Sequence, residues 1–290
     1  MSQRASPSGS EAIERHSARD GYVFDNADPQ TNLRFVTVSQ MYDPGTVRHL
    51  TELGVGLGWR CLEVGAGGGS IAGWLCDRVG PDGKVTATDI DTRFLDRLGK
   101  LNLEVRRHDI VGDPLPESTF DLVHTRLVLM HIPERESVLR RLLAALNPGG
   151  WIVAEEFDGI SVRSDSTVSP VESSFKTFAV MYQVMASRGV ELRYGRLLAG
   201  QMHRLGLTEV TAEGRIFMWQ GRSAAATMYR ANIEQLRTAI VETGLITHAE
   251  IDRDLMLLNE EGSVFPSPIM WAVRARRPFA QTHDPYRPKN

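Results

Sequence analysis

A cluster of glycines after a short apolar segment is the first place in the chain where a ligand could bind. The segment Arg60–Val64 leads into Gly65, Gly67 and Gly69, which have the spacing G-x-G-x-G. Glycines at such a turn adopt positive φ without steric cost and let a ligand approach the backbone. The dinucleotide fingerprint G-x-G-x-x-G requires a third glycine where this chain has Ser70. The pattern therefore departs from an NAD site by one residue, and a tight turn without a ligand is the alternative.

An acidic residue ends the next apolar segment. Asp89 follows residues 84–88 and lies about 20 residues after the glycines, where dinucleotide-binding folds place a carboxylate that accepts hydrogen bonds from ribose hydroxyls. The alternative role is a helix N-cap for a segment that starts at Thr92, and Asp91 could also fill that role. Together, the glycines and Asp89 predict a ligand of the adenosine type.

Other side chains could transfer protons or contact a second molecule. Histidine suits general-base chemistry near neutral pH, and four histidines are candidates: His108, His124, His131 and His203. His131 follows the apolar segment 120–125 by a few residues and is our candidate catalytic residue, with helix capping or simple packing as the alternative. Three carboxylates follow a later apolar segment: Glu155, Glu156 and Asp158. They are either solvated or placed to attract a basic acceptor, and Glu155 is our candidate substrate residue.

These residues lie at the ends of alternating strand and helix segments. The predicted core strands are 60–64, 84–88, 103–107, 120–125 and 151–154, and the predicted helices between them are 70–79, 92–101 and 134–146. Two later strands, 208–219 and 268–275, bring the total to seven. This alternation is typical of an α/β fold with a doubly wound, mostly parallel seven-stranded sheet and helices on both faces. Ligands bind outside the carboxyl ends of the strands in such folds, which is where the candidate residues fall.

The segments on either side of this core differ in character. Residues 1–20 are predicted to be a mobile tail, and 21–58 an N-terminal helical lid with a turn at Asp43-Pro44-Gly45-Thr46 and a helix over 46–53. The core spans 59–160. Residues 161–276 are predicted to be a substrate-specificity region, a helical insertion that also holds the last strands, and 277–290 a tail. The helices predicted within the substrate-specificity region are 170–188, 194–205, 223–243 and 247–260.

The bulk composition excludes several classes of protein. The 290 residues include 33 Lys and Arg and 36 Asp and Glu, with a formal net charge of -3 and no dense basic stripe, so we expect no nucleic-acid partner. No apolar run reaches the roughly 18 residues of a membrane span, and residues 1–20 lack an apolar signal region. We therefore expect no membrane association and a cytoplasmic location. Cys61 and Cys76 are expected to be buried thiols, and no spacing of His, Cys and Asp is typical of a metal site.

Five motifs, in order, resemble those of the class I S-adenosylmethionine-dependent methyltransferases. They are LEVGAGGG at 62–69, VTATDI at 85–90, RHDI at 107–110, LPESTFDLV at 115–123 and LNPGGWIV at 146–153. The match covers about residues 45 to 160. The resemblance implies a Rossmann-like fold, S-adenosylmethionine as cofactor and S-adenosylhomocysteine as product.

The first part of the cofactor site follows from this resemblance. The backbone at Gly65, Ala66 and Gly67 would line the methionyl part and the ribose. Glu63 would lie beneath the glycine loop and orient it. Asp89 would hold both ribose hydroxyls.

The resemblance implies the remaining cofactor contacts as well. Ile90 would lie against the adenine face, Asp109 would accept from the exocyclic amine, and the Ile110 amide would donate to the ring. The backbone of Thr125 and Arg126 would meet the amino group of the ligand. Without the family context, Asp109 is about as well explained as a residue that caps a turn.

The acceptor is predicted from the outer segments. Tyr22 and Phe24 are candidate substrate residues that would fold over the site. Eight residues in 161–276 could line an apolar pocket or belong mostly to the core: Met181, Tyr182, Met185, Phe217, Met218, Trp219, Met228 and Tyr229. The pocket interpretation predicts a small hydrophobic or aromatic acceptor, methylated at O, N or C. Arginine outnumbers lysine as in GC-rich bacterial genomes, and we expect a role in bacterial secondary metabolism.

Two alternative functions stay open: an NAD(P)-dependent oxidoreductase and a non-catalytic S-adenosylmethionine-binding protein. The expected assembly is a monomer or a homodimer.

Overall fold

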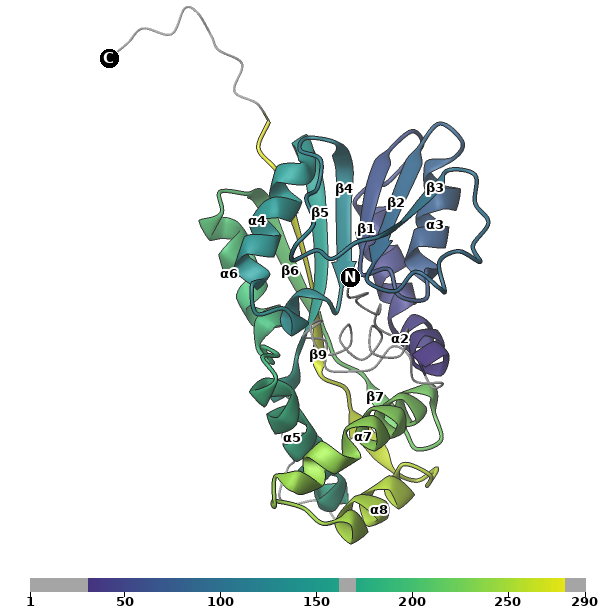
Figure 1. Ribbon diagram of the computed structural model, residues 1–290, viewed down its shortest axis with the longest axis vertical. Coiled ribbons are helices and arrows are strands. Elements are labelled where there is room, and N and C mark those ends of the chain that lie inside the picture. The colour runs from purple at the N-terminus through teal and green to yellow at the C-terminus, as the bar shows by residue number, and fades with distance from the viewer. Residues whose placement is uncertain (1–30, 162–170, 280–290) are drawn as a thin grey trace, which may run out of the picture.

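The structure is a computed structural model, and it describes residues 31–161 and 171–279. Among these residues, seven strands form one sheet in the order β3-β2-β1-β4-β5-β9-β6 (Figure 1). The strands are β1 (Arg60–Val64), β2 (Lys84–Asp89), β3 (Leu103–Arg107), β4 (Phe120–Arg126), β5 (Leu146–Asp158), β6 (Thr208–Arg215) and β9 (Ile269–Arg276). Strands β1 to β5 are parallel, and β9 is antiparallel to both β5 and β6. The predicted fold class, a doubly wound and mostly parallel seven-stranded sheet, is confirmed.

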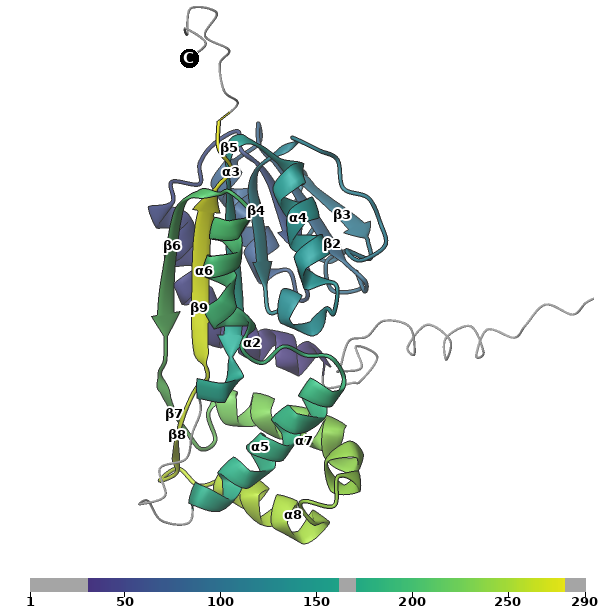
Figure 2. The same ribbon diagram turned by 90° about the vertical axis from the view of Figure 1, so that its left-hand side faces the viewer.

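Side chains of the central strands alternate between two hydrophobic cores, one on each face of the sheet. Cys61, Leu122 and Val153 belong to one core, and their neighbours Leu62 and Val123 belong to the other. Helix α3 (Ser70–Val79) covers the first face, while α4 (Arg135–Ala145) and α6 (Tyr194–Arg204) cover the second (Figure 2). This period of two is what parallel strands buried on both faces require. It holds the strand ends, and therefore the polar residues on them, in fixed register.

A group of helices, which we call the helical lobe, lies beyond the carboxyl ends of β4 and β5 (Figure 1). It contains α5 (Val171–Ser187), α7 (Ala224–Glu242) and α8 (His248–Leu257), with the hairpin of β7 (Met218–Gln220) and β8 (Val264–Pro266). Helix α8 begins with a capping box between Thr247 and Glu250. Helix α5 packs on α7 and α8. The predicted helical insertion near the last strands is therefore present.

Helix α2 (Thr31–Glu52) lies between the sheet and the helical lobe, against α7. The predicted turn at residues 43–46 is wrong, because α2 continues through Pro44. Proline inside a helix removes one backbone hydrogen bond and usually kinks or ends the helix. Here tertiary contacts on both sides of Pro44 keep the helix continuous, as shown below.

Three other expectations are corrected. Residues 92–101 form turns in place of a helix: Leu95 donates to the Thr92 carbonyl at 2.9 Å, and Gly99 takes φ +57°. Strand β5 extends to Asp158, beyond the predicted 151–154, because β9 pairs with it as far as Asp158. The predicted strand 208–219 is divided between β6 in the main sheet and β7 in the hairpin.

Candidate functional site

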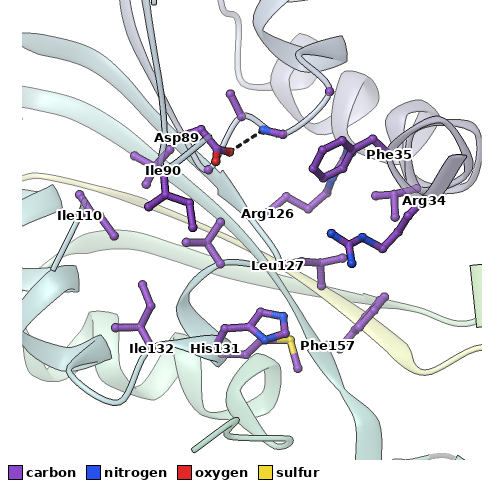
Figure 3. Close-up of a pocket in the computed structure, with 18 of the residues that line it drawn as sticks. Arg34, Phe35, Asp89, Ile90, Ile110, Arg126, Leu127, His131, Ile132 and Phe157 are labelled. Carbon is purple, nitrogen blue, oxygen red and sulfur yellow. Dashed lines mark hydrogen bonds between the residues drawn. The ribbon is translucent and has the colours of Figure 1, made fainter. Parts of the chain in front are cut away.

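A cavity of about 250 Å³ lies at the carboxyl ends of the parallel strands, between the glycine loop, α2 and the helical lobe (Figure 3). Ten predicted site residues line it: Glu63, Gly65, Ala66, Gly67, Asp89, Ile90, Asp109, Ile110, Arg126 and His131. Thr125 and Glu155 are buried and are not among its lining residues. Tyr22 and Phe24 lie outside the described residues. Sequence-based reasoning therefore located most of one wall of the cavity.

The glycine loop is shaped by close neighbours on both sides. Gly65 has φ +65°, and a Cβ at this position would lie 2.2 Å from Cγ2 of Val128. Gly67 has φ +51°, and its Cβ would lie 3.0 Å from the Phe35 ring on α2. Glycine is required at both positions for the backbone conformation and for space. Phe35 thus covers the loop that β1 presents to the cavity.

Ser70, the residue that replaces the third glycine of the NAD fingerprint, begins α3. Its Oγ lies 2.9 Å from Oγ of Ser39 on α2, and the Ser39 hydroxyl is also 2.9 Å from the Phe35 carbonyl. Helix α2 therefore contacts the loop through an aromatic ring and the start of α3 through a hydroxyl.

Asp89 lies beside the glycine loop and lines the cavity with it. One carboxylate oxygen accepts from the Gly67 amide at 2.8 Å and the other accepts from the Asp91 amide at 3.0 Å. Burial raises the pKa of Asp89, and the amides of Asp91 and Gly67 oppose that shift. The N-cap alternative is removed, because no helix begins at Thr92. Each oxygen keeps a lone pair with which it could accept from a ligand hydroxyl.

Asp109 and Ile110 form the next part of the cavity wall, after β3. One Asp109 carboxylate oxygen accepts from the Val111 amide at 2.8 Å, so the side chain does cap a turn. It also lines the cavity, as Ile110 does. Arg141 on α4 holds this turn by donating to the carbonyls of Ile110 and Val111. Capping and cavity lining therefore coexist at Asp109.

A buried imidazole links two carboxylates below the glycine loop. His124 on β4 donates from Nδ1 to Glu63 Oε2 at 2.6 Å and from Nε2 to Glu155 Oε2 at 3.3 Å. All three side chains are buried. Burial by itself lowers the pKa of His124, but Glu63 and Glu155 raise it to about 9, so the imidazole carries a proton at neutral pH. The pKa of Glu155 falls below its usual range, because the hydrogen bond and charge of His124 outweigh burial.

The linkage continues from Glu155 to α2. Thr46 donates to Glu155 Oε2 and accepts from Arg126 Nη1 at 2.9 Å. Arg126 Nη2 donates to Asp43 at 2.8 Å. We call the six residues of this linkage the buried ionic chain: Glu63, His124, Glu155, Thr46, Arg126 and Asp43. Polar residues inside otherwise apolar strands, such as Glu63 and His124, are the signal from which it could have been found.

The imidazolium of this chain makes stability depend on alkaline pH. In the unfolded chain His124 has a pKa of about 6.5, against about 9 when folded. Its contribution to the free energy of unfolding is therefore fully present below about pH 6.5 and is lost as the pH rises through about 9. We expect a loss of roughly 3 kcal/mol over this window, measured by urea unfolding. A stability that stays constant from pH 7 to 10 would contradict a charged His124.

The three carboxylates at the end of β5, Glu155, Glu156 and Asp158, are buried rather than solvated, which corrects that alternative. Glu156 accepts from the amides of Leu129 at 2.8 Å, Val128 at 3.2 Å and Met130 at 3.3 Å, and Asp158 accepts from Arg196 at 2.5 Å. Glu156 thereby anchors the 3₁₀ turn η1 (Leu129–His131), which ends with the candidate catalytic residue. None of these three carboxylates is among the residues that line the cavity.

His131 lines the cavity from this turn. Burial, with a smaller contribution from the positive charges of Arg34 and Arg135, lowers the pKa of His131 to about 4. The imidazole is therefore neutral at neutral pH. Figure 3 shows the ring on the same side of the cavity as Ile132 and Phe157.

The far end of the cavity is apolar and is built mainly by the helical lobe. Five of the eight predicted pocket residues line it: Met181, Tyr182, Met185, Met228 and Tyr229. Phe217, Met218 and Trp219 do not, and Trp219 instead stacks on Phe265 at 4.5 Å. The sequence missed Arg34, Phe35 and Phe157, which also line the cavity, because α2 and the end of β5 were not predicted there.

In ranges 31–161 and 171–279, no helix has the length and apolar character to cross a bilayer. Over the same ranges, no three His, Cys, Asp or Glu side chains are grouped so that they could hold a metal ion.

The seven-stranded sheet, with parallel strands β1 to β5 and the reversed strand β9, is the fold of the class I, Rossmann-like methyltransferases. Residues 62–154 match the family described as "Methyltransferase domain". The resemblance predicted from the sequence is therefore confirmed for this core.

Curated relatives and a solved structure that are similar to this chain are methyltransferases as well. Methyltransferase str2 of Strobilurus tenacellus is 36% identical over 112 residues, which cover 38% of this chain and 39% of that protein. The UbiE ubiquinone/menaquinone biosynthesis C-methyltransferase of Laribacter hongkongensis is 31% identical over 154 residues, which cover 50% and 61%. The chain thus spans about two to three fifths of these relatives. The Haemonchus contortus phosphoethanolamine N-methyltransferase 2 structure shares the fold at a TM-score of 0.54, with 14% identity over 88% of this chain and 59% of that chain.

Proposed function

We propose that this protein uses S-adenosylmethionine to methylate a small hydrophobic or aromatic molecule. The observation that carries the proposal is the position of Asp89. Its carboxylate faces the glycine loop in a cavity that continues without a break to the methionine and tyrosine side chains of the helical lobe. One end of the cavity suits an adenosine-type ligand, and the other suits an apolar acceptor.

The residues at the first end fit the cofactor. Gly65 and Gly67 have no side chain that would fill the space beside Val128 and Phe35. Asp89 and Asp109 offer carboxylate oxygens, which suit hydroxyl and amine donors, and Ile90 and Ile110 offer apolar surface. When bound, S-adenosylmethionine supplies a methyl group on a sulfonium that is already reactive. The chain then has to hold the acceptor in line and exclude water.

The second end fits an apolar acceptor. Met181, Met185 and Met228 are flexible apolar side chains that adapt to an irregular ligand. The hydroxyls of Tyr182 and Tyr229 are hydrogen-bonded to each other, so this pair holds one polar point within the apolar wall. An end with this apolar lining would keep water from the methyl acceptor. The predicted location and the role in secondary metabolism remain predictions.

His131 is proposed to contact the acceptor between the two ends. As a neutral imidazole, it can accept a hydrogen bond that a hydroxyl or amine of the methyl acceptor donates. A pKa of about 4 means that it holds a transferred proton weakly. It therefore suits orientation of the acceptor, or brief passage of a proton, better than storage of one.

The test is turnover of a panel of acceptors with S-adenosylmethionine carrying a labelled methyl group. The relatives' names include both C- and N-methyltransferases, so the panel contains phenols, apolar amines, quinols and carboxylic acids. We expect label in at least one apolar acceptor. Binding of S-adenosylmethionine without labelling of any acceptor would favour the non-catalytic alternative, and NAD(P)-dependent reduction would favour the oxidoreductase.

A further inference from the structure

Helix α2 contains a proline where its role changes. Before Pro44, the helix provides cavity-lining residues: Arg34, Phe35, Val38 and Ser39. After Pro44, it is anchored in the protein, with Leu50 in the core that contains Cys61 and α3. Pro44 has no amide hydrogen to give to the Gln40 carbonyl, so the helix lacks one of its own hydrogen bonds here. Kinks and bends of helices concentrate at such positions.

One guanidinium connects the chain on both sides of this proline. Arg126 donates to Asp43, immediately before Pro44, at 2.8 Å, and to Thr46, two residues after it, at 2.9 Å. The Arg126 side chain is only 10% exposed. A planar fork that binds two groups at once fixes their relative position more firmly than a single point charge does. Arg126 therefore fixes the two halves of α2 relative to each other.

The other members of the buried ionic chain tie this point to the sheet. Thr46 donates to Glu155 on β5, and His124 on β4 joins Glu155 to Glu63 on β1. Glu63 lines the cavity beneath the glycine loop. The linkage thus runs from the cavity floor through three neighbouring strands to the Pro44 region of α2.

The first half of α2 reaches the cofactor end of the cavity. Phe35 packs on Gly67 and Gly68, and Ser39 contacts Ser70. A change in the direction of residues 31–43 would therefore move the Phe35 ring off the loop.

We propose that the buried ionic chain sets the direction of α2 at Pro44 and so holds residues 31–43 as a lid over the cofactor end of the cavity. Thr46 and Arg126 are positioning residues for this lid, since they act through α2. The binding part of this inference rests on the proposed function, whereas the lid itself does not.

The test compares Thr46→Val and Arg126→Lys with the wild type. Valine keeps the shape of Thr46 and removes its hydroxyl, and lysine keeps the charge of Arg126 and loses the fork. Thr86→Val is the matched control. Thr86 is buried in β2, does not belong to the buried ionic chain and does not line the cavity. The two readouts are hydrogen exchange of residues 31–43 and the Kd of S-adenosylhomocysteine.

Both chain variants are expected to exchange about tenfold faster in residues 31–43, while β1 and β4 keep their protection. Both are expected to bind S-adenosylhomocysteine about tenfold more weakly, because the closed lid is populated less. The control should change neither. A purely structural role would speed exchange throughout the sheet instead, and that result, or unchanged exchange in residues 31–43, would overturn the proposal.

Two provisions separate the possible failures. If Arg126→Lys fails to fold, Asp43→Asn weakens the same bridge at a side chain that is 24% exposed. If the wild type does not bind S-adenosylhomocysteine, the proposed function fails while the exchange experiment still decides the lid.

Discussion

Replacing Asp89 with alanine is expected to weaken the binding of S-adenosylhomocysteine by at least about 100-fold. The carboxylate would accept from two vicinal ribose hydroxyls, and hydrogen bonds to a charged group contribute more than neutral ones. Its current partners are the amides of Gly67, which lines the cavity, and of Asp91, which is half-buried, so water can replace the lost acceptor at both. The effect should therefore appear in affinity, measured by calorimetry, with a change in stability below about 1 kcal/mol.

Two comparisons make this result specific. Asp89→Asn keeps one acceptor oxygen and should bind with intermediate affinity. Asp82→Ala changes an exposed aspartate in the turn before β2 and should bind like the wild type. An Asp89→Ala variant with wild-type affinity would remove the ribose assignment.

Replacing His124 with glutamine is expected to lower the free energy of unfolding by about 3–5 kcal/mol. The change removes the cation between Glu63 and Glu155 and leaves two buried carboxylates without it. Urea unfolding at pH 7 measures the loss. The variant should also lack the decline in stability that the wild type shows as the pH rises through about 9.

A second substitution tests whether charge is the cause. In the Glu63→Gln, His124→Gln double variant, one buried carboxylate is neutral, and at least about 1 kcal/mol should be recovered relative to the single variant. His203→Gln, at an exposed histidine of α6, is the matched control and should be neutral. Equal stability of the single and double variants would show that packing rather than charge dominates.

The parts of the fold that the sequence predicted are those set by local pattern. Strands β1 to β4 and helix α3 follow from short apolar runs, their period and the flanking glycines, since each packs its own apolar residues against the core. The sequence predicts a turn at Pro44 in place of a continuous helix α2, because the residue that supports the helix there, Arg126, lies on the distant strand β4. Likewise, β5 was predicted too short because β9 supplies the pairing that extends it to Asp158.

The candidate site divides in the same way. Residues at strand ends, such as Asp89 and Asp109, were predicted because parallel strands bring their carboxyl ends to one edge. Phe35 and Phe157 were not, since their place in the cavity depends on how α2 and the extension of β5 lie in space. Glu155 was expected beside the substrate but is buried in the sheet with His124 and Thr46, a contact between distant segments that no local spacing encodes.

The most direct test of the central claim is a calorimetric titration of the wild type with S-adenosylhomocysteine and, separately, with NAD. The glycine loop, Asp89 and the Ser70 contact to α2 predict binding of one S-adenosylhomocysteine per chain and no binding of NAD. Binding of NAD without binding of S-adenosylhomocysteine would contradict the assignment of this site.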